Sequence, residues 1–296
     1  MSKTPDPATA GESSALGAAL LSTLLIAGPV VVDAGKFASA AQPLTTDTVI
    51  VTDSQSLATG EARIPVAGGE LPVYWARPQQ QKHAPVILVV QEIFGVHEHI
   101  RDVCRRLAKQ GYYAVAPELY FRQGDVVKLA SIDEIRAVVA KVPDAQVLSD
   151  LDATVAWAGQ QGADTGRLGL TGFCWGGRVA WLYAAHQPRL KAAVAWYGRL
   201  VGDTDSLRPQ NPIDVAAGIK VPVLGLYGGQ DQGIPLASVQ QMQSALQKAG
   251  SRSRIEVYPD APHAFHADYR PSYRKDAATD GWNKLLQWFA AAGLKP

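Results

Sequence analysis

The sequence contains few cysteines, almost no excess of charge and no internal repeat, and each of these shortages excludes a class of protein. Its 2 cysteines, Cys104 and Cys174, are too few for a disulfide framework or a zinc site. With 28 basic and 27 acidic side chains the formal net charge is +1, so we expect no nucleic-acid partner and no acidic disordered tail. The lack of a repeat with a period of roughly 20–50 residues argues against solenoids and propellers.

The rest of the composition is that of an ordinary globular protein. Of the 296 residues, 47% are hydrophobic and 19% are charged. This supply of apolar residues suits one large α/β domain rather than two small ones.

The N-terminal part has a different character. Residues 15–32 are almost wholly apolar, and Ala38-Ser39-Ala40 resembles a signal-peptidase site. However, one basic residue before this run is offset by two acidic ones, and the run is short for a membrane span. We expect a leader over 1–55, which is a signal, an anchor or an unstructured segment, and a folded domain over 56–296. The protein is then cytoplasmic or exported according to whether 15–40 acts as a signal, and a membrane is a partner only if the apolar run is kept as an anchor.

Short apolar runs alternate with amphipathic runs from about residue 60 onward. The runs that predict buried strands are 86–90, 112–117, 167–173, 191–197, 221–227 and 254–259. Apolar residues at helical spacing predict helices over 98–110, 176–187 and 235–249, and around 147–158 and 282–289. Repeated β-α-β units predict a mainly parallel sheet with helices on both faces. In such a sheet the ligand site lies outside the carboxyl ends of the strands.

The strongest local motif is Gly172-Phe173-Cys174-Trp175-Gly176-Gly177, between a predicted strand and a predicted helix. This is the nucleophile-elbow pattern of the α/β-hydrolase fold, with cysteine in place of serine. The turn would expose Cys174 near the positive end of a helix, which favours the thiolate, and would aim the Trp175 amide at the reacting carbonyl. The alternative is a tight strand-to-helix turn with a buried structural cysteine.

A cysteine nucleophile needs a base, and the base needs an acid that orients it. In this fold the acid and then the histidine follow the nucleophile along the chain. Asp231 ends the predicted strand 221–227 and its Gly-Gly turn, and His263 follows the strand 254–259 in the same way. The rival candidates are Asp260 for the acid and His266 for the base. The alternative for Asp231 and for His263 is an ordinary loop residue without a catalytic role.

The segment after the predicted strand 86–90 provides two further candidates. The Ile93 amide lies where this fold places the second oxyanion donor. Glu92 would lie beside the sulfur, where a carboxylate can accept the thiol proton, although a solvated loop carboxylate is the simpler interpretation.

Two histidine pairs suggest a metal site only weakly. His97-Glu98-His99 and His263-x-x-His266 have no evident fourth ligand, and adjacent positions at a helix start point in different directions. We therefore expect no metal. Cys104 lies on the apolar face of its helix and is expected in the core.

Several motifs together resemble the dienelactone hydrolase (carboxymethylenebutenolidase) family. They are QEIFGVHE, APELY followed by Arg122, TGFCWGG, GLYGGQD and APHAF, in order over about 60–293. The resemblance implies a triad of Cys174, Asp231 and His263. It also implies that Glu92 activates the thiol when substrate binds and that the amides of Ile93 and Trp175 form the oxyanion hole. Arg122 matches a family arginine that binds the substrate carboxylate.

The sequence departs from the family pattern at one position. The best-known members carry a second carboxylate-binding arginine four residues after the catalytic histidine, and here that residue is Ala267. Arg270, three residues further on, is the candidate substitute. This departure weakens the prediction of a dienelactone substrate more than the prediction of hydrolytic chemistry.

We therefore expect an α/β hydrolase that cleaves a small ester or lactone through a thioester and needs no cofactor. One alternative is a general carboxylesterase or acyltransferase of the same fold. The other is a non-catalytic binding or thiol-sensing protein. The sequence does not predict an oligomeric state.

Overall fold

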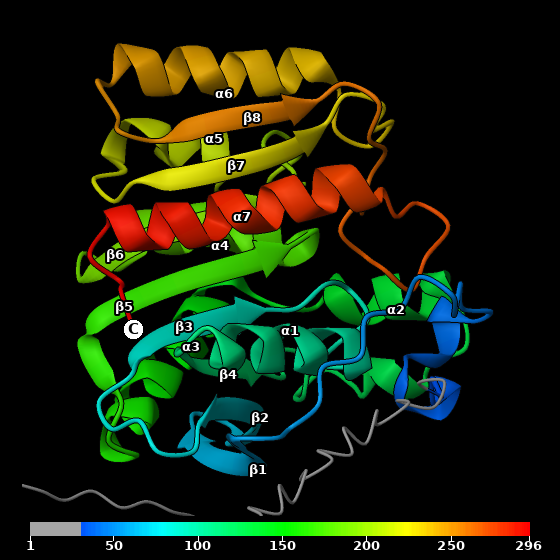
Figure 1. Ribbon diagram of the computed structural model, residues 1–296. Helices are drawn as coiled ribbons and strands as arrows, with labels where there is room; N and C mark the ends of the chain where they lie inside the picture. Colours follow the sequence, from blue (N-terminus) through cyan, green and yellow to red (C-terminus); the bar gives the residue numbers. More distant parts are fainter. Residues whose placement is uncertain (1–30) are drawn as a thin grey trace, which may run out of the picture. The chain divides into compact units, whose positions relative to one another are not determined.

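The computed structural model describes residues 31–296, and within it Val32–Pro296 form one compact unit. An eight-stranded sheet crosses this unit in the order β1-β2-β4-β3-β5-β6-β7-β8 (Figure 1). The strands are β1 Leu57–Val66, β2 Gly69–Pro78, β3 Pro85–Val90, β4 Tyr113–Pro117, β5 Asp164–Phe173, β6 Leu190–Trp196, β7 Val223–Gly228 and β8 Arg254–Tyr258. Strands β3 to β8 are parallel, whereas β2 is antiparallel to both β1 and β4. The predicted α/β-hydrolase fold with a mainly parallel sheet is thus confirmed.

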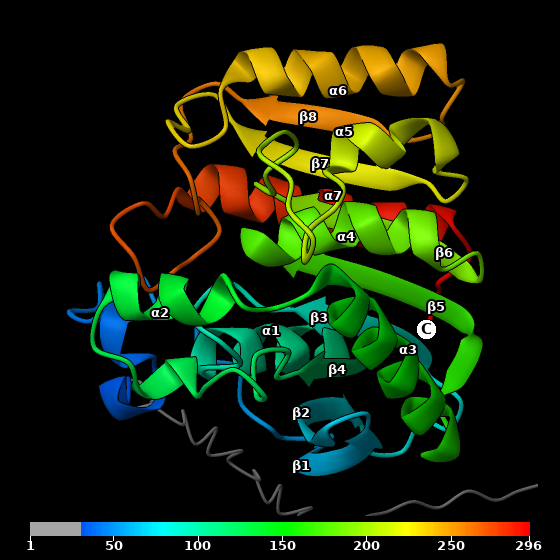
Figure 2. The same ribbon diagram turned by 180° about the vertical axis from the view of Figure 1, so that it is seen from behind.

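Helices cover both faces of the sheet (Figures 1 and 2). Helices α1 and α7 lie on one face, and α3 and α4 lie on the other. The helices are α1 Glu98–Lys109, α2 Ile132–Val139, α3 Asp144–Gln160, α4 Trp175–His186, α5 Pro212–Val215, α6 Leu236–Lys248 and α7 Lys275–Ala291. No helix in the described part of the chain is long and apolar enough to cross a membrane.

The central strands have the burial that their composition predicts. All residues of β3, β4 and β7 are buried, because helices cover both sides of these strands. Strands β1 and β2 and helix α2 were not predicted from the sequence. The outer strand β1 is only half-buried, with exposed residues interspersed along it, so its sequence has no continuous apolar run. Helix α2 buries only Ile135, but the capping box of Ser131 and Glu134 was a readable signal for its start.

The compact unit also contains residues 32–55, which the sequence analysis set aside with the leader. We call residues 32–56 the N-terminal strap. Phe37 and Ala38 are buried in it. The Thr45 amide donates to the Tyr269 carbonyl at 3.0 Å, and the Thr48 hydroxyl donates to the Asp268 carbonyl at 2.6 Å. The strap is thereby fastened to the loop that follows His263, while most of the apolar run 15–32 lies outside the described residues.

Candidate active site

Cys174 lies on a sharp turn between β5 and α4. Its backbone has φ 54° and ψ −111°, a strained conformation for a residue with a side chain. Neighbouring backbone leaves no room for a Cβ atom: one at Gly172 would lie 2.1 Å from the Gly176 oxygen, and one at Gly176 would lie 2.4 Å from the Val90 oxygen. The Cys174 amide donates to the Trp196 carbonyl at 3.0 Å, which ties the turn to β6. The glycines at these positions therefore make the turn possible.

A chain of hydrogen bonds joins Cys174, His263 and Asp231. The distance from Cys174 Sγ to His263 Nε2 is 3.2 Å, and that from His263 Nδ1 to Asp231 Oδ2 is 2.7 Å. The other carboxylate oxygen of Asp231 accepts from the amides of Gly233 and Ile234 at 2.8 and 3.1 Å. These two amides fix the carboxylate, so that it can hold the orientation of the imidazole.

The two rival residues lie elsewhere. Asp260 is exposed on the surface. His266 is buried among aromatic rings, with its ring centroid 5.0 Å from that of Phe173 and 4.5 Å from that of Trp196. Neither takes part in the hydrogen-bond chain of Cys174.

The protonation of His263 follows from its two partners. Burial lowers the pKa of His263, but the hydrogen bonds to Asp231 and Cys174 outweigh it and raise this pKa to about 10. The imidazole is therefore a cation at neutral pH, beside the sulfur. The next residue, Ala264, has φ 58°, so the loop that presents His263 is itself strained.

The backbone amides of Ile93 and Trp175 are the predicted oxyanion-hole donors. Trp175 is the first residue of α4, where an amide has no partner within its helix. Ile93 lies in the turn after β3, and neither amide donates to a backbone carbonyl in the described part of the chain. Their role as oxyanion donors stays a prediction.

Glu92 is buried rather than solvated. Its Oε2 accepts a hydrogen bond from the Tyr269 hydroxyl at 2.6 Å and lies 3.7 Å from His97 Nε2. Burial raises the pKa of Glu92, but the interactions with His97, His99 and Tyr269 outweigh it and lower this pKa to about 2. The carboxylate is therefore ionised. Among the described residues it accepts a hydrogen bond from Tyr269 and forms none with Cys174.

The two candidate arginines differ in their surroundings. The Arg122 guanidinium binds both oxygens of Asp150, at 2.7 and 2.9 Å, and its Nε donates to the Ala67 carbonyl at 2.7 Å. The half-buried Arg270 guanidinium lies 5.3 Å from the centroid of the Phe94 ring. Within residues 31–296, Arg270 forms no ion pair or side-chain hydrogen bond, so its charge is available to a ligand.

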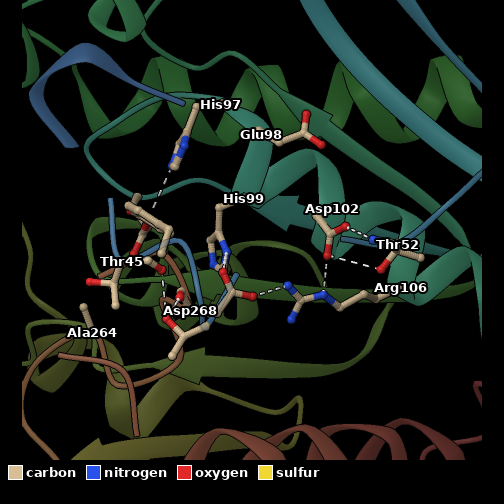
Figure 3. A network of polar contacts seen from close by, with 12 residues as sticks. Thr45, Thr52, His97, Glu98, His99, Asp102, Arg106, Ala264 and Asp268 are labelled. Atoms are coloured by element: carbon tan, nitrogen blue, oxygen red, sulfur yellow. Dashed lines mark hydrogen bonds and ion pairs between the residues drawn. The ribbon is translucent and has the colours of Figure 1, made fainter. Parts of the chain in front are cut away.

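A polar network that the sequence did not predict joins the start of α1 to the loop after His263 (Figure 3). His99 Nδ1 and the Asp268 carboxylate are hydrogen-bonded at 3.1 Å, and Arg106 bridges Asp268 to Asp102. Asp102 in turn accepts from the Thr52 amide of the strap at 2.6 Å. No three acidic, histidine or cysteine side chains of the described chain are arranged to hold a metal ion. The network instead fastens the loop that carries His263 and Tyr269 to α1.

A cavity of about 1180 Å³ lies away from Cys174. It is lined by the strap, β1, β2, the start of α1 and the segment after β4, and none of the residues in the Cys174 hydrogen-bond chain borders it. Glu118 borders this cavity, and burial raises the pKa of Glu118 to about 7. The cavity therefore adjoins the neighbour of Glu92, His97, but none of the residues in the Cys174 hydrogen-bond chain.

The family of the chain follows from comparison with known proteins. Residues 71–293 match the model of the Dienelactone hydrolase family. The chain belongs to this family. It is a dienelactone hydrolase-like hydrolase, as the motifs predicted.

Relatives match over most of their own length. A "Putative carboxymethylenebutenolidase" of Methylorubrum extorquens is 62% identical over 260 residues, which cover 87% of this chain and 89% of the relative. A protein of the same name from Escherichia coli is 55% identical over 261 residues, or 88% and 96% of the two chains.

Solved structures show the same fold. The crystal structure of a "Putative Dienelactone Hydrolase" from Klebsiella pneumoniae is 55% identical and has a TM-score of 0.78, over 79% of this chain and 98% of that one. A dienelactone hydrolase-like promiscuous phosphotriesterase from metagenomic libraries is 18% identical, with a TM-score of 0.67 over 80% and 99% of the chains, and shares the fold alone.

Proposed function

We propose that this protein hydrolyses a small lactone or ester through a thioester on Cys174, with His263 as the proton carrier and Asp231 as its orienting acid. The observation that carries the proposal is the hydrogen-bond chain from Cys174 Sγ through His263 to Asp231, at 3.2 and 2.7 Å. A sulfur beside an imidazolium and a helix N-terminus is stabilised as the thiolate, which is the nucleophilic form.

The reaction runs in two halves. The thiolate attacks the carbonyl carbon, and the amides of Ile93 and Trp175 donate to the oxyanion. The carbon–oxygen bond breaks, and the leaving oxygen takes the proton of His263, which leaves a thioester and a neutral imidazole. His263 then removes a proton from water, the hydroxide attacks the thioester, and the carbon–sulfur bond breaks to release the acid and restore the thiolate.

Glu92 has a proposed role that rests on the family resemblance. In molecules whose Cys174 still carries a proton, Glu92 would accept that proton when substrate enters the site. In the structure Glu92 is bound by Tyr269, so this role requires the carboxylate to leave that hydroxyl. A Glu92→Gln variant that keeps full activity would remove Glu92 from the mechanism.

The proposed substrate is a lactone that bears a carboxylate, in keeping with the carboxymethylenebutenolidase name of the relatives. Arg270 is the better candidate for its anchor, because its guanidinium has no anionic partner among the described residues. A substrate-binding role for Arg122 stays a prediction, and it would require Arg122 to share or break its ion pair with Asp150.

Trapping the acyl-enzyme tests the proposal. We expect p-nitrophenyl acetate to give a burst of nitrophenol and a mass increase of one acetyl group on Cys174. Cys174→Ala should abolish both signals, whereas the matched variant Cys104→Ala, whose thiol is buried away from the site, should keep them. Acylation and turnover that survive in Cys174→Ala would end the proposal.

A second candidate function is a general carboxylesterase that does not select for a carboxylate. Ala267 and the ion pair of Arg122 favour it, because they leave fewer cations for an acidic substrate than the family pattern provides. A wild type that hydrolyses neutral esters faster than carboxylate-bearing lactones would select this alternative.

A further inference from the structure

The turn between β3 and α1, which carries Ile93, is held by a side chain from another segment. Among the amides of residues 93–96, only that of Val96 donates a hydrogen bond within the described chain, and its acceptor is Oε2 of Glu118 at 2.7 Å. Glu118 directly follows β4, the strand that pairs with β3. Because these amides form no backbone hydrogen bonds among themselves, the place of the turn depends on such outside contacts.

Glu118 is itself fixed and packs tightly against the turn. Its amide donates to the Pro72 carbonyl of β2 at 2.8 Å. Gly95 has φ 75°, and a Cβ atom there would lie 3.0 Å from Glu118 Oε2, so this position requires glycine. The Val96 carbonyl is bound as well, because Arg101 Nε donates to it at 3.2 Å. A carboxylate and a guanidinium thus hold the two polar groups of the Val96 backbone.

The other end of the turn lies against the nucleophile elbow. A Cβ atom at Gly176 would lie 2.4 Å from the Val90 oxygen and 2.6 Å from the Gln91 oxygen, so the backbones of the two segments are in contact. Ile93 follows Gln91 by two residues, and Val96 follows Ile93 by three. A displacement of Val96 is therefore passed to the Ile93 amide through a short stretch of chain.

We infer that Glu118 is a positioning residue for the hydrolysis: through the Val96 amide, its carboxylate holds the turn where the Ile93 amide can meet the oxyanion. This inference rests on the proposed function, since it takes Ile93 as an oxyanion donor. Such a donor acts only at about 2.7–3.1 Å from the developing charge. A misplacement of about 1 Å in an active site can cost roughly a hundredfold in rate, so a residue outside the Cys174 hydrogen-bond chain can matter this much.

The charge of Glu118 adds a dependence on pH. Burial raises the pKa of Glu118 to about 7, and the charge of Asp125 acts in the same direction. The Val96 amide, the nearby Gln91 side chain and the Arg101 guanidinium oppose this rise. Ionisation costs folding stability because the carboxylate is buried, but an ionised carboxylate is a stronger acceptor than a carboxylic acid. The turn should therefore be held more firmly above about pH 7 than below it.

Two reactions of Cys174 separate the positioning of the turn from the reactivity of the sulfur. Acylation by p-nitrophenyl acetate forms an oxyanion, whereas alkylation by iodoacetamide displaces iodide from a methylene carbon and forms none. Both rates are measured by mass spectrometry on the full-length protein. In Glu118→Leu, which keeps a similar bulk but has no acceptor, we expect acylation to fall by roughly ten- to a hundredfold and alkylation to keep its wild-type rate.

Glu118→Gln is the conservative variant, because its amide oxygen can still accept from Val96. It should recover most of the acylation rate that Glu118→Leu loses. In the wild type the acylation rate should rise with pH through about 7, where His263 does not titrate because its pKa is about 10, and Glu118→Gln should lack this rise. The control is Asp53→Asn, which changes another carboxylate of the cavity that binds Lys109 at 2.6 Å, and it should leave both rates unchanged.

Each outcome supports or overturns the inference. Equal losses of acylation and alkylation in Glu118→Leu would overturn it and assign Glu118 to the general packing of the site. Unchanged acylation in Glu118→Leu, with Cys174 still acylated, would also overturn it while the proposed function stands. If Glu118→Leu does not fold, Glu118→Gln decides, and a rise through about pH 7 equal to that of the wild type would overturn the inference. Acylation and turnover that survive in Cys174→Ala would instead overturn the proposed function.

Discussion

Replacing Asp231 with asparagine tests the electrostatics of the candidate active site most directly. The asparagine side chain would keep the size of the aspartate, and its carbonyl oxygen could still accept from the amides that now bind Asp231. The negative charge of the carboxylate would be lost, however, so the 2.7 Å hydrogen bond to His263 Nδ1 would no longer be charge-assisted. We expect the domain to fold normally and the pKa of His263 to fall.

The size of this fall follows from the partners of His263. Burial opposes the cation, while Asp231 and Cys174 raise the pKa of His263 to about 10. A hydrogen bond to a charged group is worth about 1.5–3 kcal/mol, and one pKa unit corresponds to about 1.4 kcal/mol. Loss of the carboxylate should thus lower the pKa of His263 by about one to two units and, by analogy with serine proteases, lower kcat by about 10⁴-fold.

Titration by NMR of histidine labelled in the ring measures this directly, with His263→Gln used to assign the signal. In the wild type the His263 ring should stay protonated through neutral pH and titrate near pH 10. Because the folded pKa lies above the ordinary 6.5, the stabilisation from this pair is complete below that pH and is lost as the pH rises through about 10.

The matched control is Asp260→Asn, on the exposed part of the loop that leads to His263. It should change neither the titration nor kcat. A His263 ring that titrates near its ordinary value in the wild type would refute the electrostatic argument. An effect confined to Asp260→Asn would show that the acid had been assigned to the wrong carboxylate.

The sequence was sufficient for the six parallel strands β3 to β8 and for the order of the polar residues at their carboxyl ends, but not for β1 and β2. Continuous apolar runs are produced by strands that are buried on both faces, so β3, β4 and β7 could be located from composition alone. The candidates Cys174, Asp231 and His263 could be located because each follows a predicted strand, although β8, before His263, is a half-buried edge strand. Their mutual distances were a prediction from topology, and the structure brings the three together.

The surroundings of Glu92 could not be predicted in the same way. Its partners Tyr269 and His97 lie on the loop after His263 and at the start of α1, and only the folding of the loop back onto α1 brings them together. Contacts of this kind depend on tertiary packing rather than on any local motif.

Three further variants test the packing around the site. In Gly176→Ala the new Cβ would lie 2.4 Å from the Val90 oxygen, so urea unfolding should show a loss of about 3 kcal/mol that Gly218→Ala, in open space, does not share. Burial raises the pKa of Glu118 from 4.5 to about 7, so its ionisation destabilises the fold as the pH rises through this range. Glu118→Gln should therefore stabilise the protein more at about pH 8 than at about pH 5, by up to about 3 kcal/mol, and an equal effect at both would contradict this. The last variant concerns the strap: Phe37 is buried with its ring centroid 5.8 Å from that of His97 and 5.5 Å from that of Tyr269, so it supports the residues that hold Glu92. Phe37→Ala should lower the free energy of unfolding by about 3–5 kcal/mol and reduce ester turnover, and cutting the chain after Ala40 should do the same because it removes this ring. A chain that begins at Ala41 and matches the stability and turnover of one that begins at Val31 would show that the strap contributes nothing to the site.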